Sequence, residues 1–149
     1  SSPRCCAKPM RMMCRKDRAV RLGLWRARSV PSVISITDIF SRIDDYEHPR
    51  VAAMVNECAV KFVKLKGEFV WHHHDEEDEL FYVVQGSLLM KLRDGDVTVN
   101  AGEMILIPHG VEHCPIAAEE VHLILFERAA TINTGNVVNE KTRVTVDTL

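Results

Sequence analysis

Apolar residues follow two different periods along this 149-residue chain. Between positions 35 and 45 they recur at helical spacing, which predicts one short amphipathic helix. Ser35 or Thr37 can cap the start of this helix, because their hydroxyl groups accept a hydrogen bond from a free backbone N–H. The recurring positions are Ile36, Ile39, Phe40 and Ile43.

From Val51 onward, short apolar runs alternate with turns that contain glycine. Such a pattern predicts an antiparallel barrel or sandwich. The Asp94-Gly95 step favours a hairpin with a type I′ turn, in which both central residues have positive φ. We expect residues 129–149 to form an irregular polar tail with one closing strand around Val144. The predicted strands lie at 60–65, 80–84, 88–92, 97–99, 104–107 and 121–126.

The length and composition correspond to one globular domain with a sizeable core. Hydrophobic residues make up 46% of the chain and charged residues 27%, which argues against wholesale disorder. No apolar run approaches the roughly 18 residues of a membrane-spanning helix. We therefore expect no membrane association.

The charge is distributed unevenly, although the net charge is only −2. Residues 1–30 hold nine basic residues and one acid, Asp17, whereas residues 31–149 hold ten basic and twenty acidic residues. The acidic body argues against nucleic-acid binding. We interpret residues 1–30 as a basic arm and residues 31–149 as a single domain. The arm is Arg-rich and amphipathic from Met10 to Leu24, which is typical of a mitochondrial transit peptide; an unstructured leader is the alternative.

The five cysteines form no CxxC pair and are odd in number. A disulfide framework needs an even, regularly spaced set, so the sequence favours a reducing intracellular compartment, the cytoplasm first and the mitochondrion as the alternative. The cysteines are Cys5, Cys6, Cys14, Cys58 and Cys114.

Three consecutive histidines, His72 to His74, precede an acidic run that ends at Glu79. On an extended strand His72 and His74 point to one side and His73 to the other. Glu79 can return beside them as a carboxylate ligand, and His113 is the best placed source of a fourth. This mixed nitrogen and oxygen set suits Fe, Mn, Ni, Cu or Zn rather than Ca or Mg. A solvated charged loop is the alternative for the histidine run.

Two motifs in register extend this interpretation. The stretch Gly67 to Gly86 contains HxH, a glutamate five residues later and a glycine seven further on; the stretch Gly102 to His113 reads glycine, five residues, then PxGxxH. These stretches resemble the first and second motifs of the cupin family, and the resemblance extends over residues 51–128. Two departures are the spacing of Gly67 from His72, one residue shorter than is common, and Ala117 in place of a frequent asparagine.

The resemblance implies an all-β cupin jelly-roll barrel with a divalent metal held by His72, His74, Glu79 and His113. It is greatest to small stand-alone cupins often labelled mannose-6-phosphate-isomerase-like. It implies isomerase, dioxygenase or lyase chemistry on a small polar or chelating molecule, or a non-catalytic ligand-binding or sensor role. No catalytic residue beyond the ligands can be named from the sequence. A homodimer that pairs through residues 51–60 would cover an exposed strand edge.

Overall fold

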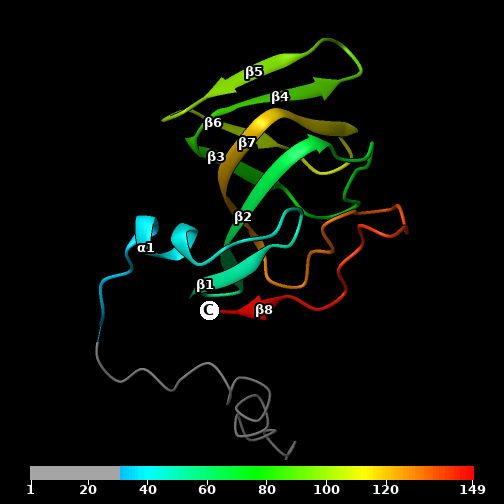
Figure 1. Cartoon of the computed structure of the whole chain (residues 1–149). Helices are drawn as coiled ribbons and strands as arrows, with labels where there is room; N and C mark the ends of the chain where they lie inside the picture. Colours follow the sequence, from blue (N-terminus) through cyan, green and yellow to red (C-terminus); the bar gives the residue numbers. More distant parts are fainter. Residues whose placement is uncertain (1–30) are drawn as a thin grey trace, which may run out of the picture. The chain divides into compact units, whose positions relative to one another are not determined.

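The structure is a computed structural model that describes residues 31–149; the expectations for residues 1–30 lie outside the described residues. Residues 34–149 form one compact unit with one short helix and eight strands (Figure 1). None of the helices in this described part is long and apolar enough to cross a bilayer. In chain order the elements are α1 (Ile36–Ser41), β1 (Arg50–Val55), β2 (Cys58–Glu68), β3 (Glu79–Gln85), β4 (Ser87–Leu92), β5 (Val97–Asn100), β6 (Met104–Ile107), β7 (His113–Arg128) and β8 (Asp147–Thr148).

The strands form one folded sheet in the order β5-β4-β7-β2-β1-β8, with β3 joining β7 to β6. Every pairing is antiparallel except the short parallel one between β1 and β8. The 16-residue strand β7 pairs with β4 near its start and with β3 near its end. Because β7 pairs first with β4 and then with β3, it connects the two halves of the folded sheet. The fold is the predicted all-β jelly roll.

Alternation along the strands places the core. In β3, residues 79, 81 and 83 are buried while residues 80, 82 and 84 are only half-buried. One face of each strand therefore points into the barrel, as period-2 patterning requires. The buried apolar cluster inside consists of Val63, Leu65, Phe81, Val83, Leu88, Met90, Val99, Ile107, Ala117, Val121, Leu123 and Leu125.

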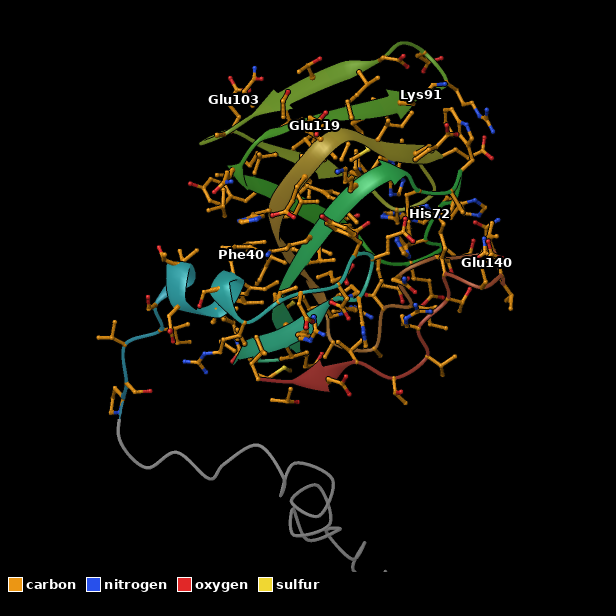
Figure 2. All side chains as sticks on the ribbon, in the orientation of Figure 1. Phe40, His72, Lys91, Glu103, Glu119 and Glu140 are labelled. Atoms are coloured by element: carbon orange, nitrogen blue, oxygen red, sulfur yellow. The ribbon has the colours of Figure 1, made fainter. Side chains whose placement is uncertain are left out.

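Helix α1 packs on the outside of this sheet and confirms the predicted helix. Ser35 caps it by accepting a hydrogen bond from the Asp38 backbone N–H. Phe40 lies 5.1 Å from the ring of Phe62 and stacks at 4.5 Å on His122. Figure 2 shows the Phe40 side chain directed from α1 toward the strands.

The β4–β5 hairpin forms as predicted, but its turn is not type I′. Gly95 has φ +139°, whereas Asp94 is not among the positive-φ residues of the described chain. Four residues, 93–96, separate the two strands. A loop of this length does not require two residues with positive φ. The Asp94-Gly95 step therefore predicted the position of the hairpin correctly but its turn type wrongly.

Two strand boundaries also differ from the sequence prediction. The last long strand begins at His113, eight residues before the predicted 121. The closing strand β8 lies at Asp147–Thr148, and Val144 is 78% exposed. Strand β8 lies on β1 at Arg50 and Val51, on an edge that the dimer hypothesis used. That hypothesis stays a prediction.

Residues 129–149, named here the C-terminal strap, are not a loose tail. Thr134 is fully buried, and its hydroxyl group is hydrogen bonded to the Val137 carbonyl and the Thr142 hydroxyl group. Asn133 donates to the Lys141 carbonyl and accepts from the Arg143 backbone N–H. These local hydrogen bonds give the strap a defined shape without an apolar periodicity, which is why the hydrophobic pattern did not reveal it.

Candidate metal centre

The four residues predicted as metal ligands converge inside the barrel. His72 and His74 come from the loop that follows β2, Glu79 begins β3 and His113 begins β7. Their ligand atoms lie within 4.8 Å of one another, and all four side chains are buried. Two ligands on opposite sides of a transition-metal ion are about 4.2 Å apart for bonds of about 2.1 Å. The cluster is therefore close to the size of a single-ion site; ligation itself stays a prediction.

A backbone bridge joins the two motifs. The His72 N–H donates to the His113 carbonyl at 3.0 Å, and the His113 N–H donates to the His72 carbonyl at 2.9 Å. This bridge is isolated, so the expectation that the three histidines occupy a strand is wrong. The alternation of side chains nonetheless holds, because His72 and His74 are buried while the side chain of His73 is 26% exposed.

Backbone carbonyls orient two of the imidazoles. The Nδ1 atom of His72 lies 2.9 Å from the Val70 carbonyl, and the Nδ1 atom of His113 lies 2.9 Å from the Val111 carbonyl. An N–H at Nδ1 satisfies these carbonyls and leaves Nε2 with a lone pair, the tautomer that binds a metal through Nε2. The buried Nε2 of His113 has no hydrogen-bond partner. A cation in the cluster would use this orphaned acceptor.

The electrostatics of the cluster also favour a cation. Burial, followed by the proximity of His113, lowers the pKa of His72 to about 4, so its imidazole is neutral near pH 7. Burial opposes ionisation of Glu79, but the imidazoles of His113 and His74 outweigh it and lower the pKa of this carboxyl group overall. The Glu79 Oε2 atom lies 3.2 Å from His74 Nε2 and 3.4 Å from His113 Nε2. Three imidazoles around a carboxylate are a donor set that fits a divalent transition metal.

A second buried carboxyl group lies beside the cluster and was missed by sequence reasoning. Glu127 on β7 accepts a 2.7 Å hydrogen bond from the Lys61 ammonium group on β2, and both side chains are 1% exposed. The signal was present in the alternation, since Lys61 stands at an inward position of β2 between Ala59 and Val63. A lysine in an inward series is anomalous unless it has a buried partner.

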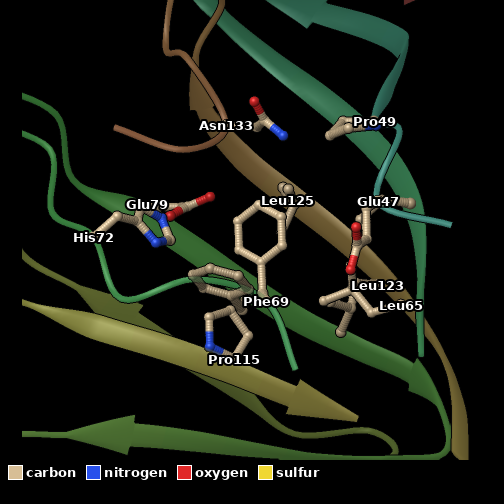
Figure 3. A pocket seen from close by; sticks show the side chains of 12 residues that line it. Glu47, Pro49, Leu65, Phe69, His72, Glu79, Pro115, Leu123, Leu125 and Asn133 are labelled. Carbon is tan, nitrogen blue, oxygen red and sulfur yellow. The ribbon is translucent and has the colours of Figure 1, made fainter. Parts of the chain in front are cut away.

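A small cavity adjoins the cluster (Figure 3). Its volume is about 30 Å³, which is room for about two water molecules. Only two of the four candidate ligands, His72 and Glu79, reach its wall. The lining is mostly apolar and consists of Glu47, Pro49, Val63, Leu65, Phe69, His72, Glu79, Phe81, Pro115, Leu123, Leu125 and Asn133.

Apart from the ligands, Glu47 is the one carboxylate in the cavity wall among the described residues. The Lys141 ammonium group donates to Glu47 at 2.9 Å and to the Glu68 carbonyl at 2.7 Å. Lys141 also lies 5.6 Å from the centre of the Phe69 ring. Besides the candidate ligands, the polar part of the cavity wall therefore consists of Asn133 of the C-terminal strap and of Glu47, which Lys141 of the strap holds in an ion pair.

The strap also touches the histidine loop. The His73 N–H donates to Asn136 Oδ1 at 2.9 Å, and the Asn136 N–H donates to the His73 carbonyl at 3.0 Å. Gly135 has φ +52°, and a Cβ atom there would stand 2.1 Å from the His73 carbonyl oxygen. Only glycine permits this approach. Figure 2 shows His72 on the side of the barrel along which the strap runs.

A wider depression of about 310 Å³ lies on the other side of His74, between the strap and the acidic bend. Its wall includes Asp75, Glu76 and Glu77 of the acidic run between His74 and Glu79. The other four histidines are not in the cluster: His48, His73, His109 and His122 each lie next to an aspartate or glutamate.

The jelly roll encloses a buried group of three histidines and one glutamate that could hold a metal ion. The Cupin domain family matches residues 61–127. A crystal structure of a cupin-2 domain containing protein from Shewanella frigidimarina is 46% identical, with a TM-score of 0.64, over 64% of this chain and 94% of that one. This chain belongs to the cupin family.

Two curated relatives match over shorter parts of this chain and of their own length. An uncharacterized protein YdbB of Bacillus subtilis is 42% identical over 60 residues, which cover 40% of this chain and 53% of that protein. A 3-hydroxyanthranilate 3,4-dioxygenase of Xenopus tropicalis is 36% identical over 77 residues, 49% of this chain and 28% of that enzyme. The chain thus spans about half or less of the length of these curated relatives.

Proposed function

We propose that this cupin holds one divalent transition-metal ion, with iron as the first candidate, and uses it for dioxygenase-type chemistry on a small molecule. The observation that carries the proposal is the buried cluster of His72, His74, Glu79 and His113, two of whose members open onto a mostly apolar cavity. A resident ion would supply a Lewis-acid or redox centre. The orphaned Nε2 of His113 and the carboxylate of Glu79 are the groups that support a cation there.

The chain's own residues set the environment of that ion. Phe69, Leu123 and Leu125 give the cavity an apolar wall, and an apolar environment strengthens electrostatic interactions inside it. The backbone carbonyls of Val70 and Val111 fix two imidazole rings in a metal-binding tautomer. These features describe a preorganised pocket and not a surface ion site.

The choice among reaction types follows from what the cavity lacks. Isomerases and lyases need a side chain that moves a proton, and the described cavity wall offers only Glu47 besides the ligands. Glu47 is engaged by Lys141 at 2.9 Å. Oxygen activation depends first on the metal, which would also lower the pKa of a chelating substrate's hydroxyl group, so this chemistry depends less on a side-chain base. The likeness to 3-hydroxyanthranilate dioxygenases supports the same choice.

The cavity size limits the substrate. A volume of about 30 Å³ accommodates a diatomic molecule or two waters, but not an aromatic acid. We therefore infer that dioxygen fits this cavity, whereas an organic substrate with a chelating group needs the wider depression of about 310 Å³ that His74 lines. The likeness to mannose-6-phosphate-isomerase-like cupins stays a prediction.

A non-catalytic ligand-binding role is the second candidate. The observation that favours it is the same ion pair of Glu47 and Lys141, because it leaves the cavity wall without a free acid or base. Such a protein would bind its metal and a small chelating ligand without turnover.

The test begins with the metal content of full-length protein purified without added metal. We expect about one Fe, Mn, Ni, Cu or Zn ion per chain. Oxygen uptake is then measured on iron-loaded protein with a panel of small catechols, aminophenols and keto acids. Glu79→Gln should abolish uptake, while His73→Ala should retain it. Stoichiometric metal without uptake on any substrate favours the binding role; absence of a transition metal, or calcium alone at the site, contradicts both.

A further inference from the structure

Glu127 lies directly beside the candidate ligand Glu79. Leu80 pairs with Phe126 across the antiparallel β3–β7 ladder, so continuing the register by one residue sets Glu79 opposite Glu127. Both side chains point into the barrel, and each residue is only 3% exposed. Directly opposed residues have Cβ atoms about 5 Å apart, and like charges at that spacing repel. The arrangement therefore needs a compensating group.

Lys61 is that group. Its ammonium nitrogen lies 2.7 Å from Glu127 Oε1 and 3.4 Å from the Thr131 carbonyl oxygen. Lys61 thus takes one oxygen of Glu127, whereas Glu127 Oε2 is buried without a hydrogen-bond partner. Burial, then the negative charge of Glu79, raises the pKa of Glu127, and Lys61 opposes this rise. These contacts form a chain from β2 through β7 to the first residue of β3.

Stability alone does not account for this pair. Replacing a buried ion pair by apolar residues of similar volume is often neutral or stabilising, because burying two charges costs as much as their attraction returns. Neither Lys61 nor Glu127 lines the cavity, so neither is placed to contact a substrate there. The polar neighbour that the ladder does provide is Glu79. Groups that contact a ligating carboxylate orient it, and their loss commonly weakens metal binding by about 10- to 100-fold.

We propose that Glu127, held in place by Lys61, is a positioning residue that keeps the Glu79 carboxylate turned toward His74 and His113. The inference rests on the proposed metal site, but it concerns residues that do not ligate. Loss of the pair would let Glu79 rotate away from the imidazoles, and the site would bind a divalent ion more weakly without losing a ligand.

The test compares an apolar pair, Lys61→Met with Glu127→Leu, with the full-length parent protein. Both are stripped of metal and titrated with Co²⁺, and the visible absorption of bound cobalt is recorded with the affinity. We expect the apolar pair to have the parent's melting temperature or a higher one, an affinity lower by about 10- to 100-fold, and shifted cobalt bands. The spectrum is the readout that a merely structural role would leave unchanged.

A conservative variant and a matched control sharpen the test. Glu127→Gln keeps the shape and the hydrogen-bonding capacity, so we expect its affinity to lie within about threefold of the parent's. The pair Asp45→Asn with Arg50→Met removes an ion pair that lies outside the cluster, with Arg50 at 2.7 Å from Asp45, and should leave affinity and spectrum unchanged.

The outcomes separate this inference from the proposed function. Parent affinity and an unshifted spectrum in the apolar pair overturn the positioning role while the metal site stands. If Glu127→Gln binds cobalt as weakly as the apolar pair, the positioning role is also overturned, because the loss of affinity would then come from the removed charge and not from a lost contact with Glu79. If the apolar pair fails to fold, a second charge-free pair, Lys61→Leu with Glu127→Met, carries the same comparison, because neither variant leaves a buried charge without its partner. A parent protein that takes up no cobalt overturns the proposed metal site itself.

Discussion

The interior of this barrel contains two regions of opposite character. One is the apolar cluster around Val83, Leu88 and Leu123, whose members are fully buried and carry no polar side-chain atom. The other holds the three histidines, Glu79, Glu127 and Lys61. Of the described residues, all four buried side-chain atoms without a hydrogen-bond partner belong to or adjoin the second region: they are His73 Nδ1, His113 Nε2, Glu127 Oε2 and Thr131 Oγ1.

The apolar region therefore contributes mainly to stability, whereas the polar region carries the candidate metal site. Apolar burial stabilises the native state by about 25 cal/mol per Å² removed from water, whereas unpaired buried polar groups cost about 1–3 kcal/mol each. The free energy gained by burial in the apolar region therefore offsets the cost of the unpaired groups in the polar region. Substitutions in the two regions should affect different observables, and the predictions below run from the largest expected effect to the smallest.

Leu88→Ala tests the apolar region. Leu88 is completely buried in the cluster and does not line the cavity beside the candidate ligands, so the substitution should lower the free energy of unfolding by about 2–5 kcal/mol. Urea titration of metal-free protein measures this loss, and cobalt affinity of the folded variant should match the parent's. A large fall in affinity with little loss of stability would show that the two regions are not separable.

His74→Ala tests the polar region, with His73→Ala as the matched control. The first removes a buried candidate ligand, and affinity should fall by at least about 100-fold, or about 2.7 kcal/mol. The second changes a side chain that lies outside the cluster and should be nearly silent. Metal stoichiometry and affinity at matched pH measure both. Metal loss in His73→Ala with retention in His74→Ala would reverse the assignment of inward and outward positions.

Gly135→Ala probes how the strap and the histidine loop depend on each other. The added Cβ atom would meet the His73 carbonyl oxygen, and φ +52° disfavours any side chain. We expect a loss of about 1–3 kcal/mol in unfolding free energy, with faster hydrogen exchange at the backbone N–H groups of residues 73 and 136. Unchanged exchange there would mean that the strap does not constrain the loop.

Glu120 gives the smallest effect and serves as a surface contrast to the buried carboxyl groups. Its contacts with His122, then with Tyr46, lower its pKa from 4.5 to about 2. Since the folded-state pKa is depressed, the stabilisation is present above pH 4.5 and is lost as the pH falls toward 2. The group is 37% exposed, so screening limits the effect to below about 1 kcal/mol.

The measurement for Glu120 is the unfolding free energy of the parent and of Glu120→Gln between pH 6 and pH 3. The difference between them should shrink as the pH falls through this window. A difference that is constant with pH would assign the contact no ionic component.

Sequence and structure agree best where neighbours along the chain decide the outcome. The helical spacing around Phe40 predicted α1, and the apolar run from Leu80 to Val84 predicted the strand β3. The HxH spacing and the later PxGxxH motif predicted the four residues that converge. Residues 1–30 lie outside the described part, so the transit-peptide hypothesis stays a prediction.

Sequence reasoning was wrong or silent where distant segments decide. Met104, in the predicted apolar strand at 104–107, is 62% exposed because β6 turns it outward from the sheet. The Asp94-Gly95 turn has a different geometry from the one its residues favour. Local propensity supplies about 1 kcal/mol or less per residue, and loop length and strand register override it.

The sequence by itself determined the strand periodicity, the two motifs and therefore the identity of the four clustered residues, because each depends on spacings of a few positions. Only the tertiary structure decided that Lys61 meets Glu127 across 66 positions, that this pair stands beside Glu79, and that residues 129–149 close over the histidine loop. Such contacts are set by the register of β7 against β2 and β3. A one-residue slip in that register would turn Glu127 to the outer face, and no local pattern in the chain records which register is adopted.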